Sequence, residues 1–493
     1  MPGMFCLVLH SHLPWLANHG RWPVGEEWLY QSWAASYLPV VDVLRRLGEK
    51  GHENLLSLGI TPVLAAQLDD PHCLEGLHHW LGNWQLRAHE AALRPGGRDL
   101  GAREHANSAW ALQQFETLWR HGASPLFREL IEANTIEVLG GPLAHPFQPL
   151  LDPRLRAFSL AEGLTDAKTR WGRRPRGIWA PECGFTPSME HGYDLAGVKH
   201  FMVDGPALHG DTTLGRPVGE ADVVAFGRDL PVSYRVWSPK SGYPGHAAYR
   251  DFHTFDHATG LKAYRVTSRK STEKAPYDPH LAAAAVKQHV DDFVHTVVRR
   301  LSSESERIGR PALAVAAFDT ELFGHWWYEG PAWLEQVLQA LPEAGVRVGT
   351  LTQARAEGFV GQSVHISDSS WGSGKDWRVW AGDQVADLVQ LNAEVVETAL
   401  AALDKNPSEL RNRTNDQLIR EALMAVSSDW AFMVSKDSAA GYARDRAHRH
   451  AHATREIAEA MTSGQFAKAE RLAQDWNQVD GLFPALDARR LQV

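Results

Sequence analysis

The sequence predicts an α/β protein with a parallel sheet. Short apolar runs typical of strands alternate with helical patterns along the chain. Polar residues stand at or just after the end of several of these runs, as they do at the active-site edge of parallel barrels. The length of 493 residues allows one large barrel with additions.

Six runs are predicted to be strands, and they are Met4–His10, Asn54–Thr61, Thr135–Gly140, Arg176–Glu182, Lys199–Asp204 and Ala312–Asp319. Helical patterns lie between them, as at Leu38–Leu47 and Phe158–Arg170. Two regions break the alternation. We expect residues 73–130 to form a helical insertion within a barrel spanning 1–380, and residues 381–493 to form an α-helical C-terminal domain.

Charge and cysteine content exclude several classes of protein. The formal charge of −9 argues against a nucleic-acid partner, because such proteins usually carry a basic excess. Cys6, Cys73 and Cys183 form neither a disulfide framework nor a CxxC metal pair, which favours a cytoplasmic protein with reduced thiols. No stretch approaches 18 apolar residues, so no membrane partner is expected.

Tryptophan is unusually frequent, with 19 Trp against 17 Phe and 10 Tyr. Its broad flat face suits stacking on a ligand, and its N–H needs a hydrogen-bond acceptor. Four of these residues stand near helical spacing in the predicted insertion and are expected to pack it, namely Trp80, Trp84, Trp110 and Trp119. Others stand in segments that also carry carboxylates, which indicates a stacking surface.

Five polar residues lie at or just beyond predicted strand ends, and they are His10, His145, Glu182, Asp204 and Asp319. His10 and His12 stand two residues apart, so in a strand both imidazoles would point to one face. They are open to three interpretations: a metal pair of the kind found in amidohydrolases, a polar rim for a ligand, or two histidines satisfied by local hydrogen bonds.

The segment Trp179–Cys183 reads WAPEC. Pro181 lacks an N–H and should mark the end of the strand, which leaves Glu182 at the rim. Glu182 is a candidate nucleophile or acid, or else a rim carboxylate in a salt bridge. Cys183 is a weaker candidate, because no base accompanies it in the sequence.

The densest motif follows the buried run AVAAF and begins with Asp319. Two more carboxylates and four aromatic residues follow within 320–330. Glycoside chemistry needs two carboxyl groups, one to attack or stabilise the anomeric carbon and one to protonate the leaving oxygen. Aromatic rings beside them fit a carbohydrate site.

Three motifs together resemble the signature of glycoside hydrolase family 57: HSHLPW at the start, WAPECGF, and FDTELFGHWWYEG. Within that family the chain is most similar to the 1,4-α-glucan branching enzymes. Supporting segments are RWPVGEEWLY, YRVWSPKSGYPG, SWGSGKDWRVW and SSDWAFM, so the resemblance runs from residue 7 to residue 433. The order of the motifs is highly specific.

The resemblance implies an incomplete TIM-like (β/α)7 barrel, with a C-terminal helical domain that contributes to the site. It implies a retaining transglycosylase in which Glu182 is the nucleophile and Asp319 the general acid/base. It also implies a set of substrate-binding residues, namely His10, His12, His145, Trp22, Trp28, Tyr234, Trp326, Trp371, Trp380, Asp429 and Trp430. No metal and no cofactor are implied, and Tyr234 falls in a segment that matches a mobile loop.

The implied substrate is an α-1,4-glucan, and a retaining mechanism predicts carboxyl groups about 5–5.5 Å apart. Relatives are associated with glycogen or with methylglucose lipopolysaccharide, and both glucans stay open. So do a 4-α-glucanotransferase or α-amylase on the same fold, a metal-dependent amidohydrolase or deacetylase, and a non-catalytic glucan-binding protein. Residues 140–151 depart from the family pattern around His145, which bears on the shape of the neighbouring subsite.

Overall fold

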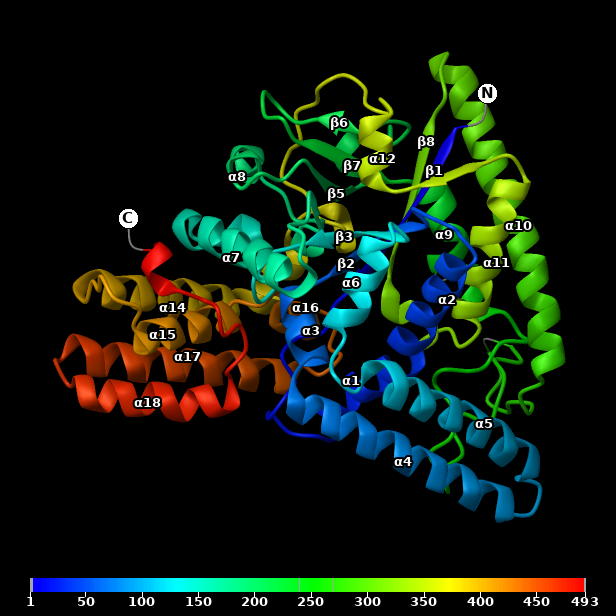
Figure 1. Cartoon of the computed structure of the whole chain (residues 1–493), viewed down its shortest axis with the longest axis horizontal. Helices are drawn as coiled ribbons and strands as arrows, with labels where there is room; N and C mark the ends of the chain where they lie inside the picture. Colours follow the sequence, from blue (N-terminus) through cyan, green and yellow to red (C-terminus); the bar gives the residue numbers. More distant parts are fainter. Residues whose placement is uncertain (1–2, 239, 269, 492–493) are drawn as a thin grey trace.

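The computed structural model describes residues 3–238, 240–268 and 270–491. A parallel sheet curls into an incomplete barrel with helices around it (Figure 1). Two long helices, α4 and α5, lie along one side, and the C-terminal helices form a separate group beside the barrel.

Within the described ranges, seven strands run parallel in the spatial order β7-β5-β4-β3-β2-β1-β8. They are β1 (Met4–Ser11), β2 (Leu56–Ile60), β3 (Ile136–Gly140), β4 (Gly177–Ile178), β5 (His200–Asp204), β7 (Val224–Arg228) and β8 (Leu313–Asp319). The two ends of the sheet meet beyond β7, where the backbone N–H of Asp229 donates to the carbonyl of Val315 at 2.8 Å. Two short strands complete the sheet: β6 (Arg216–Pro217), antiparallel to β7, and β9 (Arg347–Gly349), parallel to β1.

The strands are mainly apolar because the sheet is covered on both faces. All eight residues of β1 are buried. This strand pairs with β8 along one edge and with β9 and then β2 along the other. Its register places His10 opposite Asp319, so these two side chains leave the same face of the sheet at its carboxyl edge.

The helices around the barrel are α1 (Glu26–Ser32), α2 (Leu38–Glu49), α3 (Pro62–Leu68), α7 (Pro153–Trp171), α8 (Met189–Leu195), α9 (Leu230–Trp237), α10 (Pro279–Ile308), α11 (Gly330–Glu343) and α12 (Leu351–Ala356). Several begin with the same signal, a capping side chain followed by proline. Asp152 accepts hydrogen bonds from the N–H groups of Arg154 and Leu155 at the start of α7, and Asp278 caps α10 in the same way. A cap of this kind satisfies backbone donors that the helix leaves free, and proline at the first position loses nothing.

The insertion consists of α4 (Pro71–Leu93), α5 (Arg98–Gln114), a π-helical turn (Phe115–Trp119) and α6 (Ser124–Glu132). Trp119 is buried, and Trp80, Trp84 and Trp110 pack half-buried against the main core. The C-terminal part consists of α13 (Arg378–Ala381), α14 (Ala386–Lys405), α15 (Arg413–Ala425), α16 (Ser428–Ser435), α17 (Ala440–Thr462) and α18 (Phe466–Val479). Helix α17 lies at its centre and packs against α14, α15, α16 and α18.

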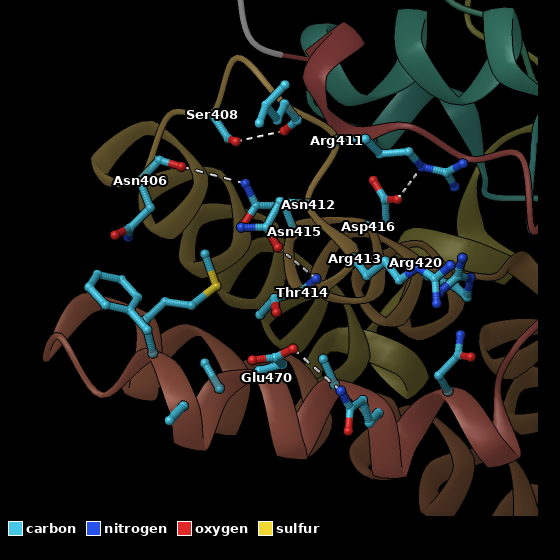
Figure 2. Close-up of a pocket in the computed structure, with 18 of the residues that line it drawn as sticks. Asn406, Ser408, Arg411, Asn412, Arg413, Thr414, Asn415, Asp416, Arg420 and Glu470 are labelled. Atoms are coloured by element: carbon cyan, nitrogen blue, oxygen red, sulfur yellow. Dashed lines mark hydrogen bonds and ion pairs between the residues drawn. The ribbon is translucent and has the colours of Figure 1, made fainter.

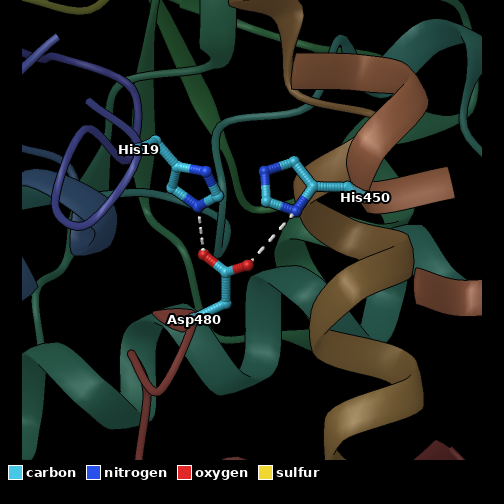
Figure 3. Close-up of side chains that lie close together, drawn as sticks. All are labelled: His19, His450 and Asp480. Atoms are coloured by element: carbon cyan, nitrogen blue, oxygen red, sulfur yellow. Dashed lines mark hydrogen bonds and ion pairs between the residues drawn. The ribbon is translucent and has the colours of Figure 1, made fainter. Parts of the chain in front are cut away.

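A buried cluster of His19, His450 and Asp480 joins the N-terminal loop to the C-terminal helices (Figure 3). His19 Nε2 lies 2.6 Å from one carboxylate oxygen of Asp480, and His450 Nδ1 lies 3.6 Å from the other. The guanidinium of Arg446 donates to His450 Nε2 at 3.0 Å, so the imidazole proton lies on Nδ1, which donates to Glu421 at 2.8 Å. A cation on Nδ1 would displace that proton and put an N–H of His450 against Arg446. The cluster therefore acts as a hydrogen-bonded joint.

Replacing Asp480 with Ala should destabilise the protein by about 3–5 kcal/mol, because it leaves Arg446 and the two histidines buried without their carboxylate. Denaturant unfolding followed by tryptophan fluorescence measures this loss. The control is Asp475→Ala, an exposed position on α18, which should change the free energy of unfolding by less than about 0.5 kcal/mol. Equal losses in the two variants would contradict the joint.

Besides the two short strands β6 and β9, which were not predicted, the sheet differs from the sequence prediction in two places. The run Val224–Arg228 was not predicted, although it forms a fully buried strand. The predicted strand Arg176–Glu182 is wrong in length: β4 pairs only at Gly177–Ile178, and Pro181 begins a 3₁₀ turn that contains Glu182. Among the described helices, none is both long and apolar enough to cross a bilayer.

Candidate functional site

The candidate site lies at the carboxyl edge of the barrel, where helix α16 of the C-terminal part meets the strand ends. His10 is the next-to-last residue of β1, Asp319 ends β8, and Glu182 follows β4. From α16, Ser428 and Asp429 reach two of the site's side chains, Glu182 and His12. Chain segments more than 240 residues apart thus meet in one place.

Glu182 is held in an unusual backbone conformation. Its φ of 59° and ψ of 17° fall in the left-handed region, which non-glycine residues rarely adopt and which is frequent at functional sites. The backbone N–H of Trp371 donates to its carbonyl at 2.9 Å. The Ser428 hydroxyl donates to Oε1 at 2.7 Å, and Trp371 Nε1–H donates to Oε2 at 3.0 Å. Each carboxylate oxygen of Glu182 therefore accepts a hydrogen bond, and the two bonds fix the orientation of the carboxylate.

The charge state of Glu182 reflects opposing effects. Burial raises its pKa, as does the charge of Asp429, while the hydrogen bonds from Ser428 and Trp371 and the nearby His12 lower it. The net pKa lies above the ordinary value for a glutamate. The two donors favour the ionised form, which is the form a nucleophile needs.

Asp319 lies in a different environment. Burial, together with the charges of Glu321 and Glu182, raises its pKa to about 8, against opposing effects of Arg228 and His12. At neutral pH this carboxyl is therefore mostly protonated and can donate a proton. Both pKa values are raised, but Glu182 accepts two side-chain hydrogen bonds that favour its ionised form, whereas Asp319 is surrounded by carboxylates that favour its protonated form. This difference is the pattern of a nucleophile and an acid.

The three histidines of the site are stacked. The rings of His12 and His145 lie 3.8 Å apart with an interplanar angle of 28°, and His10 stacks on Trp179 at 4.4 Å and 10°. His12 has both ring nitrogens engaged, with Thr61 Oγ1 at 3.0 Å and an Asp429 carboxylate oxygen at 2.9 Å. A metal ion needs ring nitrogens that point to one position, and the nitrogens of stacked rings do not. The geometry therefore favours the interpretation of these histidines as a polar rim for a ligand over a metal pair.

The histidines differ in charge. Burial lowers the pKa of His12, but Asp429, Glu182 and Glu321 outweigh it and raise that pKa above its ordinary value. Burial and the neighbouring His12 lower the pKa of His145 and of His10 well below theirs. His12, beside Glu182 and its neighbours, is thus the histidine of the group that binds a proton most readily, while the pKa shifts of His10 and His145 favour their neutral forms.

Residues 140–151, which depart from the family pattern, hold α16 against the site. Ala144 and His145 both have φ above 50°, so the chain turns sharply there. Pro146 then forms a β-bridge with Ser427, and the carbonyl of His145 accepts from the N–H of Ser428 at 3.0 Å. This segment therefore positions the hydroxyl that binds Glu182.

The predicted aromatic residues occupy three environments. Trp28, Trp326 and Trp371 are half-buried. Trp22 and Tyr234 are 79% and 41% exposed. Tyr234 lies within α9 rather than in a loop, and its hydroxyl is among the groups that raise the pKa of Arg228.

Trp380 and Trp430 lie within the protein core and present no open face. Trp380 is 2% exposed and stacks on Phe147 at 4.7 Å. Trp430 is also 2% exposed, donates to the carbonyl of Met424, and is covered by Arg446 at 5.0 Å. Their geometry suits support of the site more than direct stacking on a sugar.

Sequence reasoning did not single out three contributors. Glu321 accepts from the backbone N–H of His12 at 3.1 Å and from the Tyr37 hydroxyl at 2.5 Å, and burial raises its pKa to about 7. Its position two residues after Asp319 was the available signal. Ser428, which binds Glu182, stands directly before Asp429.

Arg228 is the third, because it ends the strand that was not predicted. It bonds Asp204 at 2.9 Å, and Lys375 lies 2.6 Å from the same carboxylate. Its guanidinium lies over the Trp371 ring at 5.3 Å from the ring centre. This pair of cations on one carboxylate fixes the ring that donates to Glu182.

Comparison with known proteins adds to this geometry. The model for glycosyl hydrolase family 57 matches residues 6–360, and a model described as 1,4-alpha-glucan branching enzyme, C-terminal, matches residues 388–491. A Mycobacterium tuberculosis protein described as a probable 1,4-alpha-glucan branching enzyme is 65% identical, with 100% of this chain and 98% of that protein aligned.

Two archaeal proteins are also similar. A 1,4-alpha-glucan branching enzyme of Thermococcus kodakarensis is 32% identical over 91% of this chain and 72% of its own length. The crystal structure of a branching enzyme of the same family from Pyrococcus horikoshii superposes with a TM-score of 0.93 at 27% identity, covering 100% of this chain and 97% of that one. The chain belongs to glycosyl hydrolase family 57.

Proposed function

We propose that this protein is a 1,4-α-glucan branching enzyme that works by a retaining mechanism. The observation that carries the proposal is the full-length identity of 65% with a probable branching enzyme. It is supported by two buried carboxyl groups at the carboxyl edge of the barrel, of which Glu182 is held by two hydrogen-bond donors and Asp319 has a pKa raised to about 8.

In this mechanism Glu182 attacks the anomeric carbon of an α-1,4 bond while Asp319 protonates the leaving oxygen. The non-reducing fragment stays on Glu182 as a glycosyl ester, and the remaining glucan leaves with a free 4-hydroxyl. Asp319, now ionised, takes the proton from a glucose 6-hydroxyl of another chain, which attacks the ester and forms an α-1,6 branch. Retention requires the two carboxyl groups to lie about 5–5.5 Å apart.

The test is incubation of the purified protein with amylose, followed by NMR of the product and by chain-length analysis after debranching. New α-1,6 signals with little gain in reducing ends support branching. Shortened linear chains with many new reducing ends would instead indicate an α-amylase, and lengthened linear chains a 4-α-glucanotransferase.

Replacing Tyr234 with Ala should raise hydrolysis severalfold relative to transfer, because we propose that this half-exposed ring, which acts on the charge of Arg228, helps keep water from the glycosyl ester. The ratio of new reducing ends to α-1,6 bonds measures this. Tyr234→Phe keeps the ring and should leave the ratio near that of the parent protein. An unchanged ratio in both variants would remove Tyr234 from the mechanism.

The proposal extends to the partner and the compartment. The natural glucan is a glycogen-like chain or a modified glucan such as methylglucose lipopolysaccharide, and the substrate panel should include both kinds. A cytoplasmic location is supported by three buried cysteines, none of them in a disulfide. Residues 1–380 and 381–493 are proposed to act as barrel and helical domain.

A further inference from the structure

A groove of about 1000 Å³ runs across the C-terminal helices, and its lining shares no residue with the candidate catalytic site. It lies between the connection 406–412, the first turns of α15, helix α18 and residues 481–484. Figure 2 shows its labelled polar side chains in a row, from Asn406 and Ser408 at one end to Arg420 at the other, with Glu470 opposite on α18. Its size suits a ligand larger than an ion.

The lining is rich in groups that bond hydroxyls from both sides. Amides of asparagine and glutamine alternate with guanidinium groups and carboxylates along it. Arg411 forms an ion pair with Asp416 at 2.8 Å and donates hydrogen bonds to two backbone carbonyls. Its positive charge is therefore largely compensated within the protein. The mixture of amides, hydroxyls, guanidinium groups and carboxylates supplies both donors and acceptors, which favours a neutral polyhydroxylated ligand over a phosphate.

Two buried polar atoms in this lining have no hydrogen-bond partner: Oδ1 of Asn415 and Nε of Arg420. Their side chains belong to residues only 2% and 4% exposed. A buried donor or acceptor left unpaired is unfavourable, so a ligand that pairs with both atoms gains binding energy by doing so. One atom accepts and the other donates, which matches a sugar hydroxyl, since a hydroxyl can do both.

The lining of the groove also includes an exposed aromatic ring. Phe466 begins α18, lines the groove and is 61% exposed, which is unusual for a phenylalanine. A sugar has a face of C–H groups, which can stack on a flat apolar ring, and an edge of hydroxyls, which can bond amides. The lining offers both kinds of contact.

We propose that this groove is a second glucan-binding site, which holds an α-1,4-glucan chain away from the catalytic carboxyls. The inference rests on the proposed function, because the sugar polymer is the substrate there. A chain held at two points is presented to the catalytic site at a raised effective concentration, so the groove should favour long glucans over short ones.

The first test uses kinetics of the full-length protein with Phe466→Ala and Gln474→Ala, two exposed positions of α18. Each should raise the apparent KM for long amylose roughly fivefold or more, with kcat and the activity on short maltooligosaccharides unchanged. Leu195→Ala, at an exposed position of α8 outside the groove, is the matched control. If both groove variants keep the parent KM for amylose, the proposal fails.

The second test locates binding directly by hydrogen exchange of the full-length Glu182→Gln protein with maltoheptaose. Protection of amides in 406–416 and 464–475, lost when Phe466→Ala is added, supports the groove. Protection confined to the barrel overturns it, and protection by inorganic phosphate but not by maltoheptaose overturns the choice of ligand. Absence of branching by the parent protein would contradict the proposed function itself, whereas normal branching without groove binding contradicts only this inference.

Discussion

Replacing Glu182 with Gln should abolish glucan transfer and hydrolysis together, with kcat lowered roughly 10⁴- to 10⁶-fold. The amide cannot form the glycosyl ester, and one of its ends would present an N–H to the donors that now hold the carboxylate, Ser428 and Trp371. Branching of amylose and release of reducing ends are the two assays, and both should fall to the same extent. A variant that lost transfer but kept hydrolysis would contradict the nucleophile.

The ester itself can be identified. A slow glucosyl fluoride substrate should add one glycosyl mass to the peptide that contains Glu182 in the parent protein and to no peptide in the variant. The control substitution is Glu190→Gln, a buried glutamate of α8 outside the site, which should leave kcat near the parent value. A glycosyl group found on the neighbouring Cys183 would instead identify that thiol as the nucleophile. The structure argues against this, because burial raises the pKa of the Cys183 thiol well above its ordinary value.

The parts of the site that could be predicted from sequence are those that follow a local rule. Continuous apolar runs that end near His10 and Asp319 correctly predicted two strands and the positions of their carboxyl ends. Such runs are typical of strands that are covered on both faces of a sheet. Pro181 correctly indicated that pairing stops before Glu182, since proline cannot donate to a ladder.

What could not be predicted depends on contacts between distant segments. Ser428 bonds Glu182 across 246 residues, and nothing in its immediate sequence separates it from an ordinary helix-start serine. Trp380, in contrast, was predicted to bind substrate because its motif resembles a stacking segment. In the structure Phe147 stacks on its ring and covers that face. Sequence identifies an aromatic residue near a site, but only packing decides which rings stay open to a ligand.

The missed strand Val224–Arg228 has a physical reason as well. Gly227 interrupts its apolar run, and isolated glycine weakens a strand pattern. A Cβ at Gly227 would come within 2.8 Å of Leu208 and Thr212, so the small residue is required by close packing. With that strand missed, Arg228 was missed too, although it is the cation nearest to the ring that aims Glu182.

Replacing Asp319 with Asn should lower kcat/KM for amylose roughly 10²- to 10⁴-fold, because the leaving oxygen then departs without a proton. A donor with a fluoride leaving group needs no such proton, so glycosylation from α-maltosyl fluoride should be far less affected. Loss of activity on both substrates to the same degree would show that Asp319 does something other than acid catalysis.

The pH dependence gives an independent check on the same carboxyl. Asp319 must carry its proton to act as the acid, and burial with the charges of Glu321 and Glu182 raises its pKa to about 8, so kcat/KM should fall as the pH rises through about 8. Removing one of those charges with Glu321→Gln should lower that pKa and move the alkaline limb to lower pH. Asp319→Asn should have no such limb. Glu321 also raises the pKa of His12, so the shift in Glu321→Gln assigns the titration to this aspartate only together with the loss of the limb in Asp319→Asn.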